Sequence, residues 1–528
     1  MLARAHAFTI DVLQTRRVTV EVDVRAGLPA FVIVGHADAA VREARERIQA
    51  ALRNSGFEFP ARRITANLAP ADVRKAGPGL DLAIACALLA ASGQLDPALL
   101  DDVALVGELG LDGHVGPTRG TLAVAQATRA AGLRTLVLAG ADAHEAALIA
   151  GLRVAPVESL CSAVRVLRGG PADSAPAARG ARARRGARHA DADHAEDGPR
   201  GLDLADVRGQ RTAVQALLIA AAGGHNLLLS GAPGTGKTML AHRLPSLLPP
   251  LGERESIEVT RLHSLLGARP TGLLRARPFR APHHTVTAAG LVGGSRQGCV
   301  GEVVLAHNGV LFLDELSEFS RAALEALRQP VEEGRVAIAR AAHSTLYPAR
   351  FMLVAATNPC PCGYAGEGER CRCSEAELAR HRRRLSGPLL DRIDLMVNLH
   401  REDHCEQDAR AGMTSRTARE RVLGARKRQA QRAGAGPGAG AGAGAGARVV
   451  NAHLDGRALA RHARLDADGR ALLARARTNG LLSSRGEQRA LRVARTIADL
   501  DEHADVSVEH LGAALALRPA FTSERGAG

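Results

Sequence analysis

The stretch Asn226-Leu-Leu-Leu-Ser-Gly-Ala-Pro-Gly-Thr-Gly-Lys237-Thr238 decides the fold of the central part of this chain. A short buried strand runs into a glycine-rich loop, and a helix is expected to begin near Met239. Glycines let backbone N–H groups turn inward around phosphate oxygens, and the helix N-terminus adds a favourable dipole. Lys237 is placed to reach nucleotide phosphates and Thr238 to bind Mg²⁺. The predicted nucleotide-binding residues are Gly231, Ala232, Pro233, Gly234, Thr235, Gly236, Lys237 and Thr238.

Two further apolar runs follow, and each ends in polar side chains. Val310 to Leu313 is followed by Asp314, expected to hold Mg²⁺, and by Glu315, expected to polarise the attacking water. The run from Phe351 to Thr357 ends at Asn358, which suits a sensor that orients water near the γ phosphate. For the acidic pair the alternative is a core strand with a solvated end, and for Asn358 it is a turn former. The order of these segments after the phosphate loop favours the catalytic reading.

Arg392, in Asp391-Arg392-Ile-Asp394, is predicted to be an arginine finger that reaches the γ phosphate of a neighbouring subunit. The alternative is an ion pair with Asp391 or Asp394. A finger that acts on a neighbour requires an oligomer, and head-to-tail interfaces close into rings.

Longer motifs give the chain a family resemblance. Arg277-Pro-Phe-Arg-Ala-Pro-His283-His284, the run from Gly301 to Glu315, and Asn358-Pro-Cys-Pro-Cys-Gly363 resemble the YifB/ComM group of magnesium-chelatase-like AAA+ ATPases. The similarity extends over nearly the whole chain except two low-complexity segments. The resemblance implies ATP and Mg²⁺ as cofactors and a homo-hexameric ring. It also implies DNA, branched or single-stranded, as the partner, with branch migration during natural transformation as the activity.

The resemblance also implies an inserted hairpin before the sensor strand. We expect it over Val331 to Arg340, with Gly334 at its tip, and expect Arg335 and Arg340 to contact DNA phosphates. An exposed hairpin with incidental charge is the alternative. His283 and His284 lie in another insert, for which a DNA contact is a weaker hypothesis. A second sensor arginine is expected in the C-terminal helices, with Arg485 as first choice and Arg489 or Arg492 as alternatives.

The expected fold class is α/β, with helical C-terminal residues. Residues 1–169 resemble the Lon-protease fold, but Lys75-Ala-Gly-Pro-Gly-Leu-Asp81 has no serine nucleophile, so a non-proteolytic domain is predicted. Residues 170–200 are expected to be a flexible linker and 201–400 an AAA+ core with magnesium-chelatase-type inserts. Residues 401–448 are read as a connector that contains a disordered Gly-Ala segment, and 449–520 as a helical lid.

Four of the eight cysteines are clustered, as Cys360-x-Cys362 and Cys371-x-Cys373. Four thiolates in one loop can hold Zn²⁺ tetrahedrally, although C-x-x-C is the commoner spacing. Reduced cysteines that stiffen the loop are the alternative.

The net charge of +14 suits a polyanionic partner, but 66 arginines against three lysines also fit GC-rich coding. A membrane span and a signal peptide are not expected, so the sequence favours the cytoplasm. The predicted function is a ring-forming, ATP-dependent DNA motor. The alternative is a chelatase-like or chaperone-like ATPase that remodels protein partners.

Overall fold

The computed structural model of the chain describes most of its 528 residues. The described residues are 1–11, 14–35, 38–73, 75, 77–174, 202–266, 272–294, 300–340, 343–366, 370–384, 387–400, 412–434, 450–479 and 482–518. Most of the expected linker and nearly all of the Gly-Ala segment lie outside them. Within this part of the chain, no helix combines the length and apolar composition that crossing a membrane requires.

The chain forms two compact units, and the second interrupts the first in sequence. One unit comprises Met1–Ala190 and Ser256–Leu274, and the other Asp191–Glu255 and Arg275–Gly528. Residues 256–274, which the sequence analysis includes in the segment 201–400, therefore group with the N-terminal residues. Ser264, on helix α8 (Glu253–Leu265), donates to the buried Glu145 carboxylate, which also accepts the Leu122 N–H at 2.9 Å. This buried hydrogen bond attaches α8 to the first unit.

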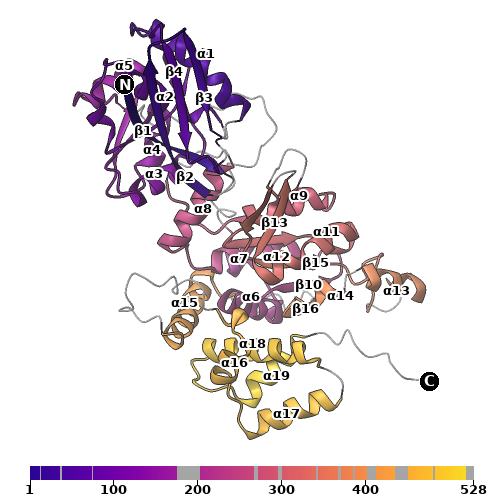
Figure 1. Cartoon of the computed structure of the whole chain (residues 1–528). Helices are drawn as coiled ribbons and strands as arrows, with labels where there is room; N and C mark the ends of the chain where they lie inside the picture. Colours follow the sequence, from indigo (N-terminus) through magenta and orange to yellow (C-terminus); the bar gives the residue numbers. More distant parts are fainter. Residues whose placement is uncertain are drawn as a thin grey trace. The chain divides into compact units, whose positions relative to one another are not determined.

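The first unit is a seven-stranded mixed sheet with helices on both faces (Figure 1). The strand order is β3-β4-β2-β1-β5-β8-β9, with antiparallel β1/β2 and β2/β4 pairs and parallel pairs elsewhere. The strands are β1 Leu2–Asp11, β2 Gln14–Arg25, β3 Ala30–Val34, β4 Arg63–Ala69, β5 Val103–Val106, β8 Thr135–Ala139 and β9 Arg153–Val157, with a separate hairpin of β6 Glu108–Leu109 and β7 Val115–Gly116. The helices are α1 Ala39–Asn54, α2 Asp81–Ala91, α3 Thr121–Ala130, α4 Ala143–Ala146 and α5 Leu160–Leu167.

Alternation along the strands divides the apolar side chains of this sheet between two cores. Leu105 and Val137 pack with α1, α2 and α5, whereas Ala104 and Leu136 pack with α3 and α4. Every residue of α2 is buried, including Asp81, whose carboxylate accepts two hydrogen bonds from Arg47 at 2.7 and 3.1 Å. Burial raises the pKa of Asp81, and this ion pair opposes that shift. Asp81 is thus a structural residue of the segment that lacks a serine nucleophile.

The second unit is built on a parallel five-stranded sheet of order β11-β12-β15-β10-β16. Its strands are β10 Leu227–Gly231, β11 Phe279–Arg280, β12 Gly309–Leu313, β15 Phe351–Thr357 and β16 Leu395–Leu399; β13 Arg335–Arg340 and β14 His343–Pro348 form a separate hairpin. Helices near the sheet are α6 Arg211–Gly223, α7 Lys237–Leu247, α9 Ala288–Val292, α10 Glu302–Leu305, α11 Arg321–Ala326, α12 Arg328–Glu333, α13 Glu375–Arg384 and α14 Gly387–Leu390. The remaining helices are α15 Ser415–Arg432, α16 Gly456–His462, α17 Ala467–Thr478, α18 Ser484–Leu500 and α19 Val508–Ala516. The α/β fold class with helical C-terminal residues is confirmed.

Helix α15 was not expected, because residues 401–448 read as a connector. Its buried positions, Ala418, Val422, Ala425 and Gln429, form one narrow stripe in an arginine-rich sequence. With so few apolar side chains, the sequence of α15 has only a weak helical period. The helix is stabilised by packing against α6, α7 and α18. One apolar cluster then runs from the sheet through α6 and α15 into α18 and α19, so sheet and C-terminal helices share a core.

Candidate functional site

The predicted catalytic side chains follow three neighbouring parallel strands. β12, β15 and β10 lie side by side, and they end before Asp314, before Asn358 and at Gly231. Because parallel strands point the same way, their carboxyl ends meet at one edge of the sheet. The structure therefore brings together the phosphate loop, the acidic pair and the sensor residue at this carboxyl edge.

The phosphate loop has the backbone that its glycines predict. Gly234 and Gly236 adopt φ values of 80° and 90°, in the left-handed region that favours glycine. Lys237, the first residue of α7, donates to the carbonyl oxygens of Gly231 and Ala232 at 2.6 and 2.9 Å. It also donates to Asn358 Oδ1 at 3.1 Å, so the ammonium group touches both the loop and the sensor. Burial lowers the pKa of Lys237, and Asp314 and Glu315 oppose that shift.

The acidic pair lies opposite the start of α7. Thr238 Oγ1 donates to Asp314 Oδ2 at 2.8 Å, which places the two expected Mg²⁺ ligands in contact. Glu315 has a φ of 53°, rare for a residue with a side chain, and its side chain is 56% exposed. His284 Nδ1 lies 3.4 Å from Glu315 Oε2, and the centroids of the His283 and His284 rings are 4.1 Å apart, with the ring planes tilted by 34°. The structure thus places His284 beside the predicted catalytic carboxylate, a contact that the sequence did not suggest.

Arg392 lies at the opposite end of the strands, where β10 and β16 begin. It precedes β16, which runs parallel to β10, and its carbonyl oxygen accepts a 2.9 Å hydrogen bond from Asn226, the residue before β10. The guanidinium group pairs with Glu332 of α12, not with Asp391 or Asp394, the partners weighed from sequence. The hydrogen bond from Arg392 holds the pKa of Glu332 below its ordinary value. Arg392 and the phosphate loop of the same chain are thus separated by the length of β10.

The candidate second-sensor arginines lie on α18, on the same side as Arg392. Arg485 is exposed in the first turn of α18 and, with Arg489, further lowers the pKa of Glu332. Arg489 lies 3.8 Å from Asp394, and Arg492 donates to the Leu454 carbonyl oxygen at 2.9 Å. Arg489 and Arg492 therefore make contacts within the chain, which leaves Arg485 as the candidate best placed to meet a ligand.

Two positioning residues were missed by the sequence analysis. Asn226 donates its side-chain N–H to the Arg392 carbonyl and accepts the Leu353 N–H at 2.9 Å, so it joins the amino ends of β10, β15 and β16. His381 on α13 is buried and its Nε2 lies 3.0 Å from the Asn358 carbonyl oxygen. The sequence does contain a signal for Asn226, because it is an Asn directly before a buried strand. It contains no signal for the contact of His381.

The predicted hairpin exists, but its expected bounds were wrong. Val331 belongs to α12, and Gly334 ends that helix with a φ of 64°, as glycines commonly do. The hairpin instead pairs Arg335–Arg340 with His343–Pro348, and residues 341–342 between the two strands lie outside the described part. Arg335 is the first residue of β13 and pairs with Glu333 at 3.2 Å, whereas Arg340 is the last residue of β13 and its backbone pairs with His343.

The four clustered cysteines come together after β15. The sulfur atoms of Cys360, Cys362, Cys371 and Cys373 all lie within 4.8 Å of one another, in an arrangement able to hold a metal ion. Cys360 is buried, and the other three are partly exposed. The tetrad follows Asn358 directly, so it belongs to the surroundings of the nucleotide site.

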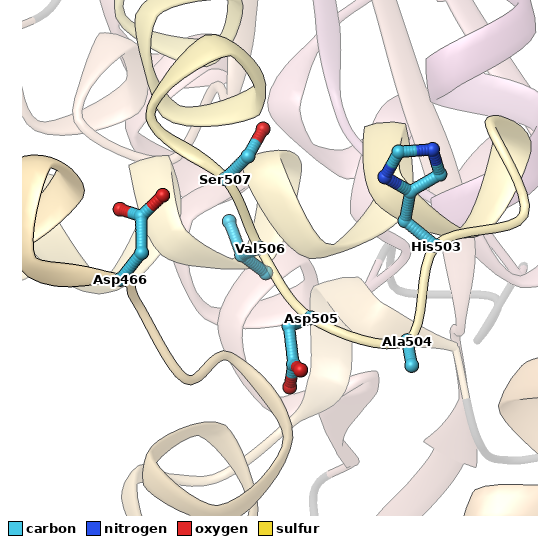
Figure 2. A pocket seen from close by; sticks show the side chains of 6 residues that line it. All are labelled: Asp466, His503, Ala504, Asp505, Val506 and Ser507. Carbon is cyan, nitrogen blue, oxygen red and sulfur yellow. The ribbon is translucent and has the colours of Figure 1, made fainter.

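A cavity of about 380 Å³ lies among the C-terminal helices (Figure 2). Asp466, His503, Ala504, Asp505, Val506 and Ser507 line it, and none of them belongs to the predicted nucleotide site. The Asp466 carboxylate caps α17 by accepting the Gly469 N–H at 2.6 Å, and Ser507 caps α19. These two polar side chains cap helices, so their presence in the cavity lining is explained by their structural role.

Comparison with family models matches three segments of the chain. Residues 203–407 match "Magnesium chelatase, subunit ChlI", residues 20–142 match "Subunit ChlI of Mg-chelatase", and residues 412–518 match "Magnesium chelatase, subunit ChlI C-terminal". A weaker relative is the magnesium-chelatase 67 kDa subunit of Heliobacterium mobile, 26% identical over 198 residues, which are 31% of this chain and 29% of that protein.

Full-length relatives are more similar. The uncharacterized protein YifB of Salmonella typhimurium is 41% identical over 504 residues, which cover 95% of this chain and 94% of that protein. The competence protein ComM of Haemophilus influenzae is 40% identical over 509 residues, 96% of this chain and 95% of ComM. Identity at this level over nearly the full length of both proteins, together with the three matched segments, means that the chain belongs to the YifB/ComM family of magnesium-chelatase-like AAA+ proteins.

Proposed function

We propose that the chain is an ATP-driven motor that acts on DNA as a ring of identical subunits. More specifically, we propose a branch-migration helicase that promotes recombination of incoming DNA in natural transformation. The family implies the use of ATP and Mg²⁺. In this proposal the phosphates bind to residues 231–238, Thr238 and Asp314 hold Mg²⁺, and a separate Zn²⁺ ion binds the four cysteines.

The proposed hydrolysis step uses the side chains at the carboxyl edge. Glu315 orients and polarises the attacking water, and Asn358 contacts both that water and Lys237. Lys237 neutralises charge that develops on the phosphate oxygens, and a Mg²⁺ ion held by Thr238 and Asp314 would supply further positive charge there; such neutralisation is the main catalytic requirement of phosphoryl transfer. The exposure of Glu315 leaves its carboxylate open to water.

The position of Arg392 carries the ring proposal. β10 has five residues, so at about 3.3 Å per residue Arg392 and the phosphate loop are on the order of 16 Å apart along the strand. Arg392 can therefore complete a nucleotide site only on another subunit. Arg485, on the same side as Arg392, would approach the same neighbouring nucleotide. Head-to-tail contacts of this kind close into a ring.

Three observations favour DNA as the substrate. The chain is 40% identical to a protein named for competence. Its net charge is +14, and β13 and β14 form a separate two-stranded hairpin whose first strand begins with Arg335 and ends with Arg340. We propose Arg340, the last residue of β13, and Arg335, which also pairs with Glu333, as the phosphate contacts.

The test is the steady-state ATPase rate with and without a four-way DNA junction. We expect the junction to stimulate hydrolysis and junction binding to weaken steeply with salt, because phosphate contacts release counterions. Lys237→Ala should abolish turnover and junction unwinding. Lys427→Ala, at an exposed position of α15, is the matched lysine control and should behave as wild type.

The outcomes separate the candidate functions. ATP-dependent unwinding by Lys237→Ala would refute the nucleotide site. ATP hydrolysis that no DNA structure stimulates would favour an ATPase that remodels protein partners.

A further inference from the structure

Two of the sulfur–sulfur distances in the cysteine tetrad match those of a zinc centre, and one is shorter. The sulfur of Cys360 lies 3.2 Å from Cys362 and 3.9 Å from Cys371, and Cys362 and Cys371 are 3.8 Å apart. Four sulfurs at about 2.3 Å from a tetrahedral Zn²⁺ are about 3.8 Å from one another. The Ala365 N–H also donates to Cys360 Sγ at 3.2 Å, the kind of outer contact that supports a thiolate ligand.

The loop that carries the tetrad packs against the phosphate loop. Gly363 has a φ of 88°, and a Cβ atom placed on it would lie 2.6 Å from Cδ of Pro233. The backbone of Gly363 is therefore in direct contact with Pro233, one of the exposed residues of the phosphate loop. Only glycine permits both this conformation and this close approach.

The same loop is also attached to the sensor residue at both ends. Cys360 follows Asn358 by two residues, and helix α13 begins at Glu375, two residues after Cys373. From that helix His381, which is 5% exposed, reaches back to the Asn358 carbonyl oxygen at 3.0 Å. A metal that joins the four cysteines would thus fix both connections of Asn358, along the chain and through α13.

We propose that a Zn²⁺ ion bound by Cys360, Cys362, Cys371 and Cys373 holds this loop in place as a support for the nucleotide site. The loop sets the position of Pro233 through the contact with Gly363. It sets the position of Asn358 in two ways, through the backbone that joins Asn358 to Cys360 and through His381. Nucleotide affinity thereby depends on the zinc centre. The support role rests on the proposed role of the phosphate loop, whereas zinc binding itself does not.

The first experiment measures zinc per chain in the purified full-length protein by mass spectrometry of the metal. We expect one zinc in wild type and none in the double variant Cys371→Ser/Cys373→Ser, which changes only partly exposed ligands. Cys161→Ser, at an exposed cysteine of α5 in the other unit, is the matched control and should keep one zinc. A wild-type chain that holds no zinc, or holds iron instead, would overturn the metal assignment.

The second experiment separates the support from the metal with two glycine variants. Gly363→Ala and Gly366→Ala introduce a side chain at similar φ values, 88° and 92°, but only the first meets Pro233; a Cβ at Gly366 has nothing within 4 Å. Both should keep one zinc. We expect Gly363→Ala and the zinc-free double variant to bind a fluorescent ATP analogue about tenfold more weakly than wild type, and Gly366→Ala to match wild type.

Equal affinity of the two glycine variants, or full affinity of the zinc-free variant, would overturn the support role while leaving zinc binding intact. The Lys237→Ala variant tests the other premise. If it binds the analogue as wild type does, the phosphate loop is not the nucleotide site, and the proposed function fails independently of zinc.

Discussion

A mixing experiment tests the claim that Arg392 acts on a neighbouring subunit. The perturbation is a pair of variants, Arg392→Ala, which keeps the phosphate loop, and Lys237→Ala, which keeps the arginine. Removal of an arginine finger lowers the rate of hydrolysis by about a thousandfold or more. Lys237 touches the loop and the sensor directly, so its loss disables the site in its own chain. Each variant alone should therefore be nearly inactive.

The ATPase rate expected for the mixture follows from the position of Arg392 at the end of β10 that is far from the phosphate loop. The phosphate loop follows β10, and Arg392 is held by Asn226 at the beginning of that strand. In the proposed ring, a complete site needs the loop of one subunit and the arginine of the next. If the variants mix randomly in equal amounts, about one quarter of the interfaces in a closed ring combine an intact loop with an intact arginine. We expect the mixture to regain about that share of the wild-type rate.

The assay is steady-state ATP hydrolysis after the two variants are mixed, with light scattering to show that each assembles as wild type does. Arg321→Ala is the matched control, because Arg321 is an exposed arginine of α11 whose partner is Glu325 in the same helix. It should retain full activity. A mixture that assembles normally but stays as inactive as its components would refute the reasoning and place the complete site in one chain.

Three further predictions concern magnesium and stability. Thr238→Ala should raise the Mg²⁺ concentration needed for half-maximal ATPase activity, because it removes the hydroxyl that contacts Asp314; an unchanged requirement would exclude Thr238 as a ligand. Asp499→Ala should lower the free energy of unfolding by about 3–5 kcal/mol in urea titrations, because it leaves the fully buried Arg495 without its carboxylate. Glu420→Ala, which breaks an exposed pair on α15, should cost less than about 1 kcal/mol. Burial lowers the pKa of His510, so the folded chain takes up this proton less readily than the unfolded chain, and stability is lost as the pH falls below about 6.5. His510→Gln retains a cap for α19 without this proton, so its melting temperature should fall less than that of wild type between about pH 7 and 5.

The sequence by itself determined the parts that are local. The phosphate loop, the Asp314-Glu315 pair and Asn358 each sit within a few residues of a buried strand. Their chemistry depends on backbone conformation over that short range, so the residue types and their order sufficed to predict the fold class and the gathering of these side chains at one edge. The family motifs extended this prediction over most of the chain.

Only the tertiary structure decided the contacts between distant segments. It placed Arg392 beside Glu332, 60 residues earlier, and His284 beside Glu315; it also attached Ser264 to Glu145, 119 residues away. It showed where the hairpin begins and that α15 is a helix. Such contacts depend on how whole elements pack, and the sequence records that packing in scattered small and polar residues. A hydrophobic period or a short motif does not predict the distance between two elements. That distance is determined by the packing of the assembled core.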